Sequence, residues 1–256
     1  MSDAHVALEA CPNCGAAMSG SRFCPACGQK AGPLDPTFHD LLHDLTHEFL
    51  HVDGKIFRTV RLLLTKPGFL SREHFDGRRA RYISPIRLYL IFSVVYFAVS
   101  ALLSTPLSEQ DRAELQEIPG ATRQISDPEF GGKLEAWIPR VIFVLVPVFA
   151  LLTSAVTRAA GRNYPQDLYF AFHMHAVVFA FATMWMLLRS AKSEAIEAAA
   201  DIGLLAFVSW YVVVAFRTAY GGTWKVAVGR SAVIGVTHFL AIVMAITALV
   251  LIALWI

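Results

Sequence analysis

The most prominent pattern along the chain is a series of five long apolar stretches separated by polar segments. A window of about 19 residues detects such stretches, and a helix needs about 20 residues to cross a hydrocarbon core about 30 Å thick. They lie at about 82–103, 137–157, 168–188, 202–220 and 231–255. The second contains Pro139 near its start, and the fourth is the shortest. The pattern therefore predicts an all-α polytopic membrane protein with about five transmembrane helices.

Composition supports this class. Of the 256 residues, 55% are hydrophobic and only 16% are charged, whereas soluble domains average about a quarter charged. These values exclude a disordered, fibrous or dedicated nucleic-acid-binding protein. The first residues lack the basic and apolar regions of a cleaved signal peptide. The chain also lacks a P-loop, a GxSxG motif and a dinucleotide-binding fingerprint, so we predict no catalytic residue.

The distribution of charge predicts the orientation of the spans, because cytoplasmic connections carry an excess of Lys and Arg. Between Lys55 and Arg87 there are nine bases and two acids, whereas the connection at 105–136 has three bases and seven acids. Basic and less basic connections alternate along the rest of the chain. We therefore expect a membrane protein with a cytoplasmic N-terminus, a C-terminus on the outer side and an acidic external loop at 105–136.

All four cysteines fall within a segment of seventeen residues near the N-terminus, as two Cys-Pro-x-Cys-Gly units. They are Cys11, Cys14, Cys24 and Cys27. In a reducing compartment this spacing indicates a metal site and not disulfides. Four thiolates form a closed structural Zn²⁺ site without an open catalytic position, although the same ligand set also suits iron. We predict a zinc ribbon at 1–32 whose folding depends on the metal.

The ribbon segment contains few basic residues. Arg22 and Lys30 are the only bases within 1–32, and nucleic-acid binding requires more positive charge. We expect an unidentified cytoplasmic protein partner instead of DNA or RNA.

The segment 33–81 is predicted to form amphipathic, basic juxtamembrane helices. The first carries histidines at every fourth position from His39 to His51, and His47-Glu48-Phe49-Leu50-His51 matches the HExxH pattern of zinc peptidases. A catalytic zinc needs a third protein ligand, and no distal motif supplies one. Three readings stay open: a peptidase, a metal site without chemistry, and a solvated polar face.

A second amphipathic stretch at Ile56–Thr65 is followed by a run of arginines that leads into the first span. The run contains Arg72, Arg78, Arg79 and Arg81. One interpretation is a positively charged anchor on the cytoplasmic side. The other is binding to anionic lipid headgroups, to which each base contributes about 1 kcal/mol near the surface. The two interpretations overlap physically.

Three histidines lie inside the predicted spans: His173 and His175 in the third, and His238 in the fifth. Histidine in a bilayer usually faces the interior of a helix bundle, where it forms hydrogen bonds between helices. The alternative is a small transporter or channel for protons or a divalent metal. Equal flux through proteoliposomes of wild type and the triple alanine variant would dismiss it. Small residues at Ser231-x3-Gly235 suit close helix packing and leave a homo-oligomer open.

Several short motifs in the first third of the chain resemble those of a known family. They are Cys27-Gly28-Gln29, Asp53-Gly54-Lys55, Pro67-Gly68, the run Gly77–Tyr82, and Pro85 before the first span. In combination they resemble an uncharacterised family of bacterial zinc-ribbon membrane proteins, the domain of unknown function 3667. The resemblance covers roughly residues 10–92 well and the later spans loosely. It implies an inner-membrane protein with a cytoplasmic zinc-ribbon head and transfers no catalytic residue.

Together these features predict three parts: the ribbon at 1–32, the juxtamembrane helices at 33–81 and the transmembrane bundle at 82–256. Because every strong signal is structural or positional, we expect a non-enzymatic anchor, sensor or recruitment protein. A transporter is the first alternative and an HExxH peptidase the second.

Overall fold

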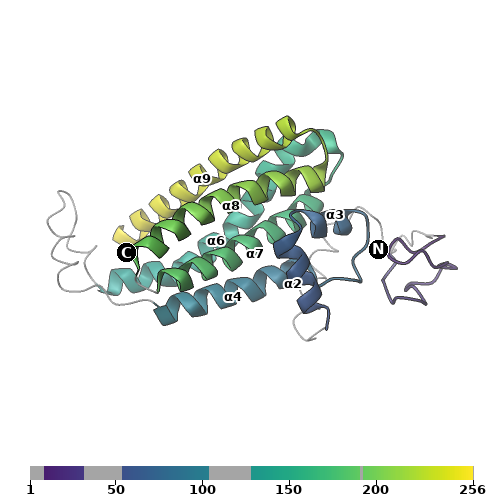
Figure 1. The fold of residues 1–256 in the computed structure, drawn as a ribbon, viewed down its shortest axis with the longest axis horizontal. Helices are drawn as coiled ribbons and strands as arrows, with labels where there is room; N and C mark the ends of the chain where they lie inside the picture. Colours follow the sequence, from purple (N-terminus) through teal and green to yellow (C-terminus); the bar gives the residue numbers. More distant parts are fainter. Residues whose placement is uncertain (1–8, 32–53, 104–127, 191–192, 256) are drawn as a thin grey trace.

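The computed structural model describes residues 9–31, 54–103, 128–190 and 193–255. Within these ranges the regular structure is helical and no strand occurs. The helices are α2 (Ile56–Thr65), α3 (Phe69–Phe75), α4 (Pro85–Leu103), α6 (Pro128–Thr157), the short 3₁₀ helix η2 (Arg158–Ala160), α7 (Tyr164–Arg189), α8 (Glu194–Tyr220) and α9 (Trp224–Trp255). Figure 1 shows the five long helices side by side along the longest axis of the molecule.

These five helices are each long and apolar enough to cross a membrane. The candidate spans are Pro85–Leu103, Trp137–Ala160, Tyr164–Arg189, Asp201–Tyr220 and Trp224–Ile252. The all-α, multi-pass fold predicted from the sequence is thereby confirmed. The protein is a multi-pass membrane protein.

Several helices begin earlier than the apolar stretches indicated. Helix α9 begins at Trp224 and not near 231, α8 begins at Glu194, and α6 begins at Pro128, within the segment expected to be an external loop. The reason is that a hydropathy window detects only the apolar part of a helix, whereas the backbone continues through polar residues at its ends. Helix α6 also continues through Pro139 and Pro147.

Helix α7 lies at the centre of the bundle. It contacts α4, α6 and α8, and α9 in turn contacts both α6 and α8. Helices α6, α7, α8 and α9 therefore form a ring of four, and α4 packs on the outside of α7. The start of α7 is fixed by a capping box, in which Asn163 and Gln166 each accept a hydrogen bond from the other's backbone N–H.

Two short helices, α2 and α3, pack on one end of this bundle (Figure 1). Helix α2 covers the amphipathic stretch predicted at Ile56–Thr65 and buries Thr59 and Leu63. Helix α3 contacts α7 and α8 and buries most of its side chains, including Glu73 and His74. The segment between the ribbon and the first span is therefore partly integrated into the bundle.

Candidate functional site

The N-terminal segment consists of two similar turns, which we call the first and second knuckles (residues 9–18 and 22–31). Their hydrogen bonds repeat with an offset of thirteen residues. Cys11 N–H donates to Ala16 O at 2.8 Å, as Cys24 N–H donates to Gln29 O at 2.8 Å. Each knuckle is also closed by a single antiparallel bridge, Ala10 with Ala17 and Phe23 with Lys30. The ribbon is thus built from two hairpin turns, and its described residues contain no multi-residue strand.

Glycine makes each turn possible. Gly15 has a φ of 78° and Gly28 a φ of 72°, a region that side chains with a Cβ rarely adopt. Each glycine N–H donates to the carbonyl oxygen of the first cysteine in its knuckle, at 2.8 and 2.9 Å. The turn directs both cysteines of a knuckle to the same side.

The four cysteine sulfurs converge on one point. They lie within 4.8 Å of one another, with Cys11 Sγ 3.7 Å from Cys27 Sγ and Cys14 Sγ 3.5 Å from Cys24 Sγ. Sulfurs at about 2.3 Å from a tetrahedral ion lie about 3.8 Å apart, so this arrangement fits a metal with little adjustment. The cluster could hold one metal ion through four sulfurs. Within the described parts of the chain, no other group of three or more such ligands occurs.

The thiols of Cys27 and Cys14 have pKa values shifted in opposite directions. The Asn13 side chain and the Gln29 backbone N–H donate to Cys27 and lower the pKa of that thiol to about 6. The Ala16 N–H acts in the same direction on Cys14, but contact with the Cys24 sulfur raises the pKa of Cys14 to about 12. Because a metal must displace the protons that remain, affinity is expected to rise with pH.

The ribbon is hydrogen-bonded to the loop that precedes the first span, residues 77–81, which we call the docking loop. Gln29 Nε2 donates to Gly77 O at 2.7 Å, and Gln29 Oε1 accepts from the N–H groups of Arg79 and Ala80 at 3.1 and 3.0 Å. Arg81 donates to Asn13 O at 2.6 Å. The cysteine cluster is therefore joined to the end of the bundle by one residue from each knuckle.

An ion-pair network holds the docking loop on α3. Arg78 donates to Glu73 Oε1 through Nε at 2.8 Å and through a terminal nitrogen at 2.5 Å, and it also pairs with Asp76 at 2.8 Å. Tyr82 O–H donates to the second oxygen of Glu73 at 3.2 Å. Burial raises the pKa of Glu73, but the hydrogen bonds and the charge of Arg78 lower it by more, so the net shift of the pKa is downward. Glu73 is therefore ionised at neutral pH.

The four arginines predicted to meet lipid headgroups make contacts within the protein. Arg78 pairs as above, and Arg81 donates to the ribbon. Arg72 lies 3.8 Å from Asp76 and reaches Thr218 O at 3.4 Å. Arg79 contributes its backbone N–H to the contact with Gln29. Their contact with lipid stays a prediction.

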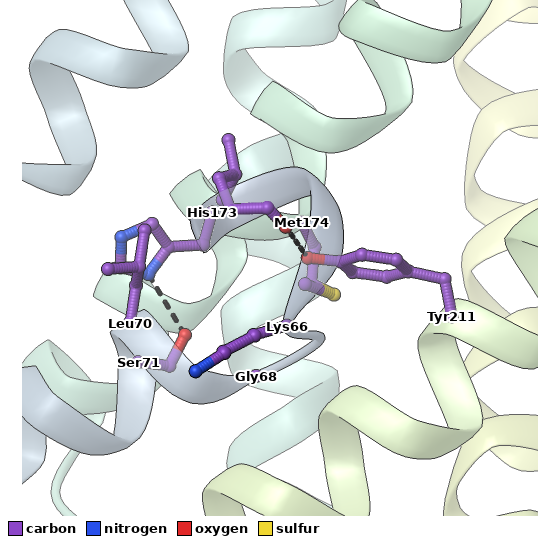
Figure 2. A pocket seen from close by; sticks show the side chains of 8 residues that line it. Lys66, Gly68, Leu70, Ser71, His173, Met174 and Tyr211 are labelled. Carbon is purple, nitrogen blue, oxygen red and sulfur yellow. Dashed lines mark hydrogen bonds between the residues drawn. The ribbon is translucent and has the colours of Figure 1, made fainter. Parts of the chain in front are cut away.

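Helix α3 is attached to the bundle through a buried hydrogen bond. Ser71 Oγ lies 2.9 Å from His173 Nδ1, and Tyr211 O–H donates to Leu63 O nearby. Figure 2 shows both bonds around a hollow lined also by Lys66, Gly68 and Met174. The two bonds join α3 to α7 and α2 to α8.

The structure separates the three intramembrane histidines. His175 and His238 lie together, with ring centroids 5.5 Å apart, whereas His173 bonds to Ser71 on the other side of α7. The Phe149 ring packs against both members of the pair, at 5.4 and 5.0 Å. Two histidines alone do not complete a metal site. The HExxH candidates His47 and His51 lie outside the described residues.

One polar cluster was not anticipated from the sequence. Asp167, in the first turn of α7, is 1% exposed; it accepts hydrogen bonds from Tyr220 O–H at 2.7 Å and from Ser154 Oγ. It links α7 to α6 and α8. Because the apolar stretch begins only at 168, the hydropathy pattern predicts that Asp167 precedes the third span. The Asn-x-x-Gln pattern at 163–166 is a helix-capping signal, and it indicates that the helix begins before Asp167.

Comparison with known families gives one match. The family model described as protein of unknown function (DUF3667) matches residues 53–97. This segment contains α2, α3, the docking loop and α4 up to residue 97. The resemblance expected from the motifs is thereby confirmed over these residues. No curated protein and no solved structure matches the chain.

Proposed function

We propose that the protein is a non-enzymatic recruitment or sensing protein of the bacterial inner membrane, whose ribbon holds a structural Zn²⁺. The observation that carries this proposal is the convergence of four sulfurs within 4.8 Å. Four thiolates fill the coordination sphere of zinc and leave no position for water or substrate. The bound zinc therefore makes the ribbon rigid, and the membrane spans hold the ribbon at the membrane surface.

The positions of basic side chains support a cytoplasmic N-terminus and a periplasmic C-terminus. The docking loop and the turns around Arg162, Arg217 and Lys225 all lie at the end of the bundle that carries α3 and the ribbon. An excess of Lys and Arg marks the cytoplasmic side. A reducing compartment also keeps the four thiols available for the metal.

The ribbon offers an apolar contact for a cytoplasmic protein. Phe23, next to Cys24, is 57% exposed, and an exposed aromatic ring on a rigid support is a common anchor of protein interfaces. With Arg22 and Lys30 as its bases, the ribbon presents too little charge for nucleic acid. Phe23 is the residue through which we expect recruitment.

Cross-linking and affinity purification from cells test recruitment. We expect Phe23→Ser to lose the proteins captured by wild type while retaining its metal, because the four ligands stay in place. Cys24→Ser should lose both the metal and those proteins. A protein set that is unchanged in both variants would remove the ribbon from recruitment.

A second partner that we propose is the anionic lipid of the same leaflet, bound by the outer face of α2. Arg61 on this helix and Lys66, which directly follows its last residue, are exposed, and Phe57 is 86% exposed. This combination of bases and an aromatic ring is typical of helices that lie in the membrane interface. Each base contributes about 1 kcal/mol near an anionic surface.

Native mass spectrometry of the purified protein tests the lipid contact. We expect the double variant Arg61→Ala/Lys66→Ala to retain several-fold fewer anionic lipids, since two bases contribute about 2 kcal/mol. Arg140→Ala, at the opposite end of the bundle, is the matched control. Equal lipid retention in the double variant and wild type would contradict the assignment.

A further inference from the structure

The two knuckles share the Cys-Pro-x-Cys-Gly unit and differ around it. Within and directly after this unit, Asn13 in the first knuckle corresponds to Ala26 in the second, and Gln29 in the second corresponds to Ala16 in the first. The cysteines, prolines and glycines of the two units are identical in position. Asn13 and Gln29 are therefore polar residues that the metal ligands themselves do not require.

These same two residues form the contact with the docking loop. The Gln29 side chain uses both of its polar atoms, because Nε2 donates to Gly77 O at 2.7 Å while Oε1 accepts from Arg79 N–H and Ala80 N–H. The carbonyl oxygen of Asn13 accepts from Arg81 at 2.6 Å. The Asn13 contact uses a backbone atom that any residue has, whereas alanine at position 29 would lose all three side-chain contacts of Gln29.

Both residues are also joined to the metal ligands. Gln29 O accepts a hydrogen bond from Cys24 N–H at 2.8 Å, and Asn13 directly precedes Cys14 in the chain. Hydrogen bonds to a ligating residue help to hold that ligand in place. A change in the metal site is thus transmitted directly to the atoms that hold the docking loop.

We propose that Asn13 and Gln29 are positioning residues that couple metal occupancy of the ribbon to its docking on residues 77–81. This inference rests on the proposed structural metal. A ribbon of this size folds only with its metal, so loss of the metal removes the geometry that places Gln29 on the loop. Since coupling between two sites is reciprocal, loss of docking must also weaken metal binding.

The docking loop connects the ribbon to the helices of the bundle. Arg78 in this loop is paired with Glu73 of α3, and α3 bonds to His173 of α7 through Ser71. The loop also leads directly into α4, which begins at Pro85. A metal-dependent contact at Gln29 therefore acts on the segment that connects the ribbon to the first span.

Hydrogen–deuterium exchange on the full chain in detergent tests the proposal at two defined amides. With zinc bound, the N–H groups of Arg79 and Ala80 should be protected, and removal of zinc by a chelator should accelerate their exchange about 5-fold or more. Gln29→Ala should produce the same acceleration while zinc is still bound. Moving the amide to the equivalent position of the other knuckle, in Gln29→Ala/Ala16→Gln, should not restore protection.

Zinc affinity tests the reciprocal half, by competition with a chromophoric chelator. We expect Arg81→Ala to weaken zinc binding about 5-fold, whereas Arg158→Ala, at an exposed position of η2, should not change it. One outcome would overturn the coupling alone. In that outcome the chain binds zinc normally, but the exchange of the Arg79 and Ala80 amides changes neither on removal of zinc nor in Gln29→Ala. A chain that binds no zinc would overturn both the coupling and the proposed structural metal.

Discussion

Replacing Gly68 with alanine is expected to destabilise the protein by about 3 kcal/mol or more, a larger effect than other single glycine substitutions in the described bundle. Gly68 has a φ of 74°, which costs a residue with a Cβ about 1 kcal/mol or more. A Cβ built there would also lie 2.8 Å from Ala215 Cα and in contact with Ala215 O. These are backbone atoms of α8 that cannot rotate away, so forced packing adds about 1–3 kcal/mol.

Thermal unfolding of the detergent-solubilised protein measures this effect. For a chain of this length, about 3 kcal/mol corresponds to a decrease in melting temperature of about 10 °C. Gly161→Ala is the matched control, because Gly161 has a φ of 66° but nothing within 4 Å of its added Cβ. We expect a loss of about 1 kcal/mol there. Equal melting temperatures for the two variants would show that α3 does not approach α8 as closely as described.

The second large effect concerns the ribbon itself. Cys24→Ser, or removal of the metal from wild type, is expected to unfold residues 9–31 while the bundle stays folded. The buried apolar cluster of the ribbon consists of Cys11, Met18 and Cys24, which is far too small to fold alone. Binding of structural zinc supplies about 10 kcal/mol or more in such modules. The bundle has a separate core around α7 and does not depend on this energy.

Limited proteolysis with trypsin measures this change. Cleavage after Arg22 and Lys30, both within the ribbon, should become fast in Cys24→Ser and in chelated wild type. Met18→Ala, which removes a buried side chain but retains all four ligands, should be cleaved only slightly faster than wild type. Slow cleavage of the Cys24→Ser variant would contradict a metal-dependent fold.

The sequence was sufficient to predict the features that depend on local pattern. The five spans follow from continuous apolar composition, and the convergence of the four sulfurs follows from two Cys-Pro-x-Cys-Gly units whose glycines permit the turns. Helix α2 was predicted with both ends because amphipathic spacing begins at Ile56 and the Pro67-Gly68 turn follows it. In each case the signal lies within about 25 consecutive residues.

Contacts between distant segments could not be predicted in the same way. Gln29 meets the docking loop 48 residues away, and Ser71 meets His173 across 102 residues. Gln29 belongs to the Cys27-Gly28-Gln29 motif, but the local sequence does not indicate which distant segment its side chain contacts. The arginine run was similarly ambiguous, because only the tertiary structure shows that Arg78 is paired with Glu73 and Asp76.

The number of zinc ions per chain, measured by elemental analysis of the full-length protein purified from membranes, tests the central claim most directly. We expect one zinc ion per chain in wild type and none in Cys24→Ser, with the bundle still folded. Two zinc ions in wild type, one of which survives in Cys24→Ser, would indicate a further site such as the HExxH histidines. Absence of zinc from wild type would contradict a metal-held ribbon on the membrane domain.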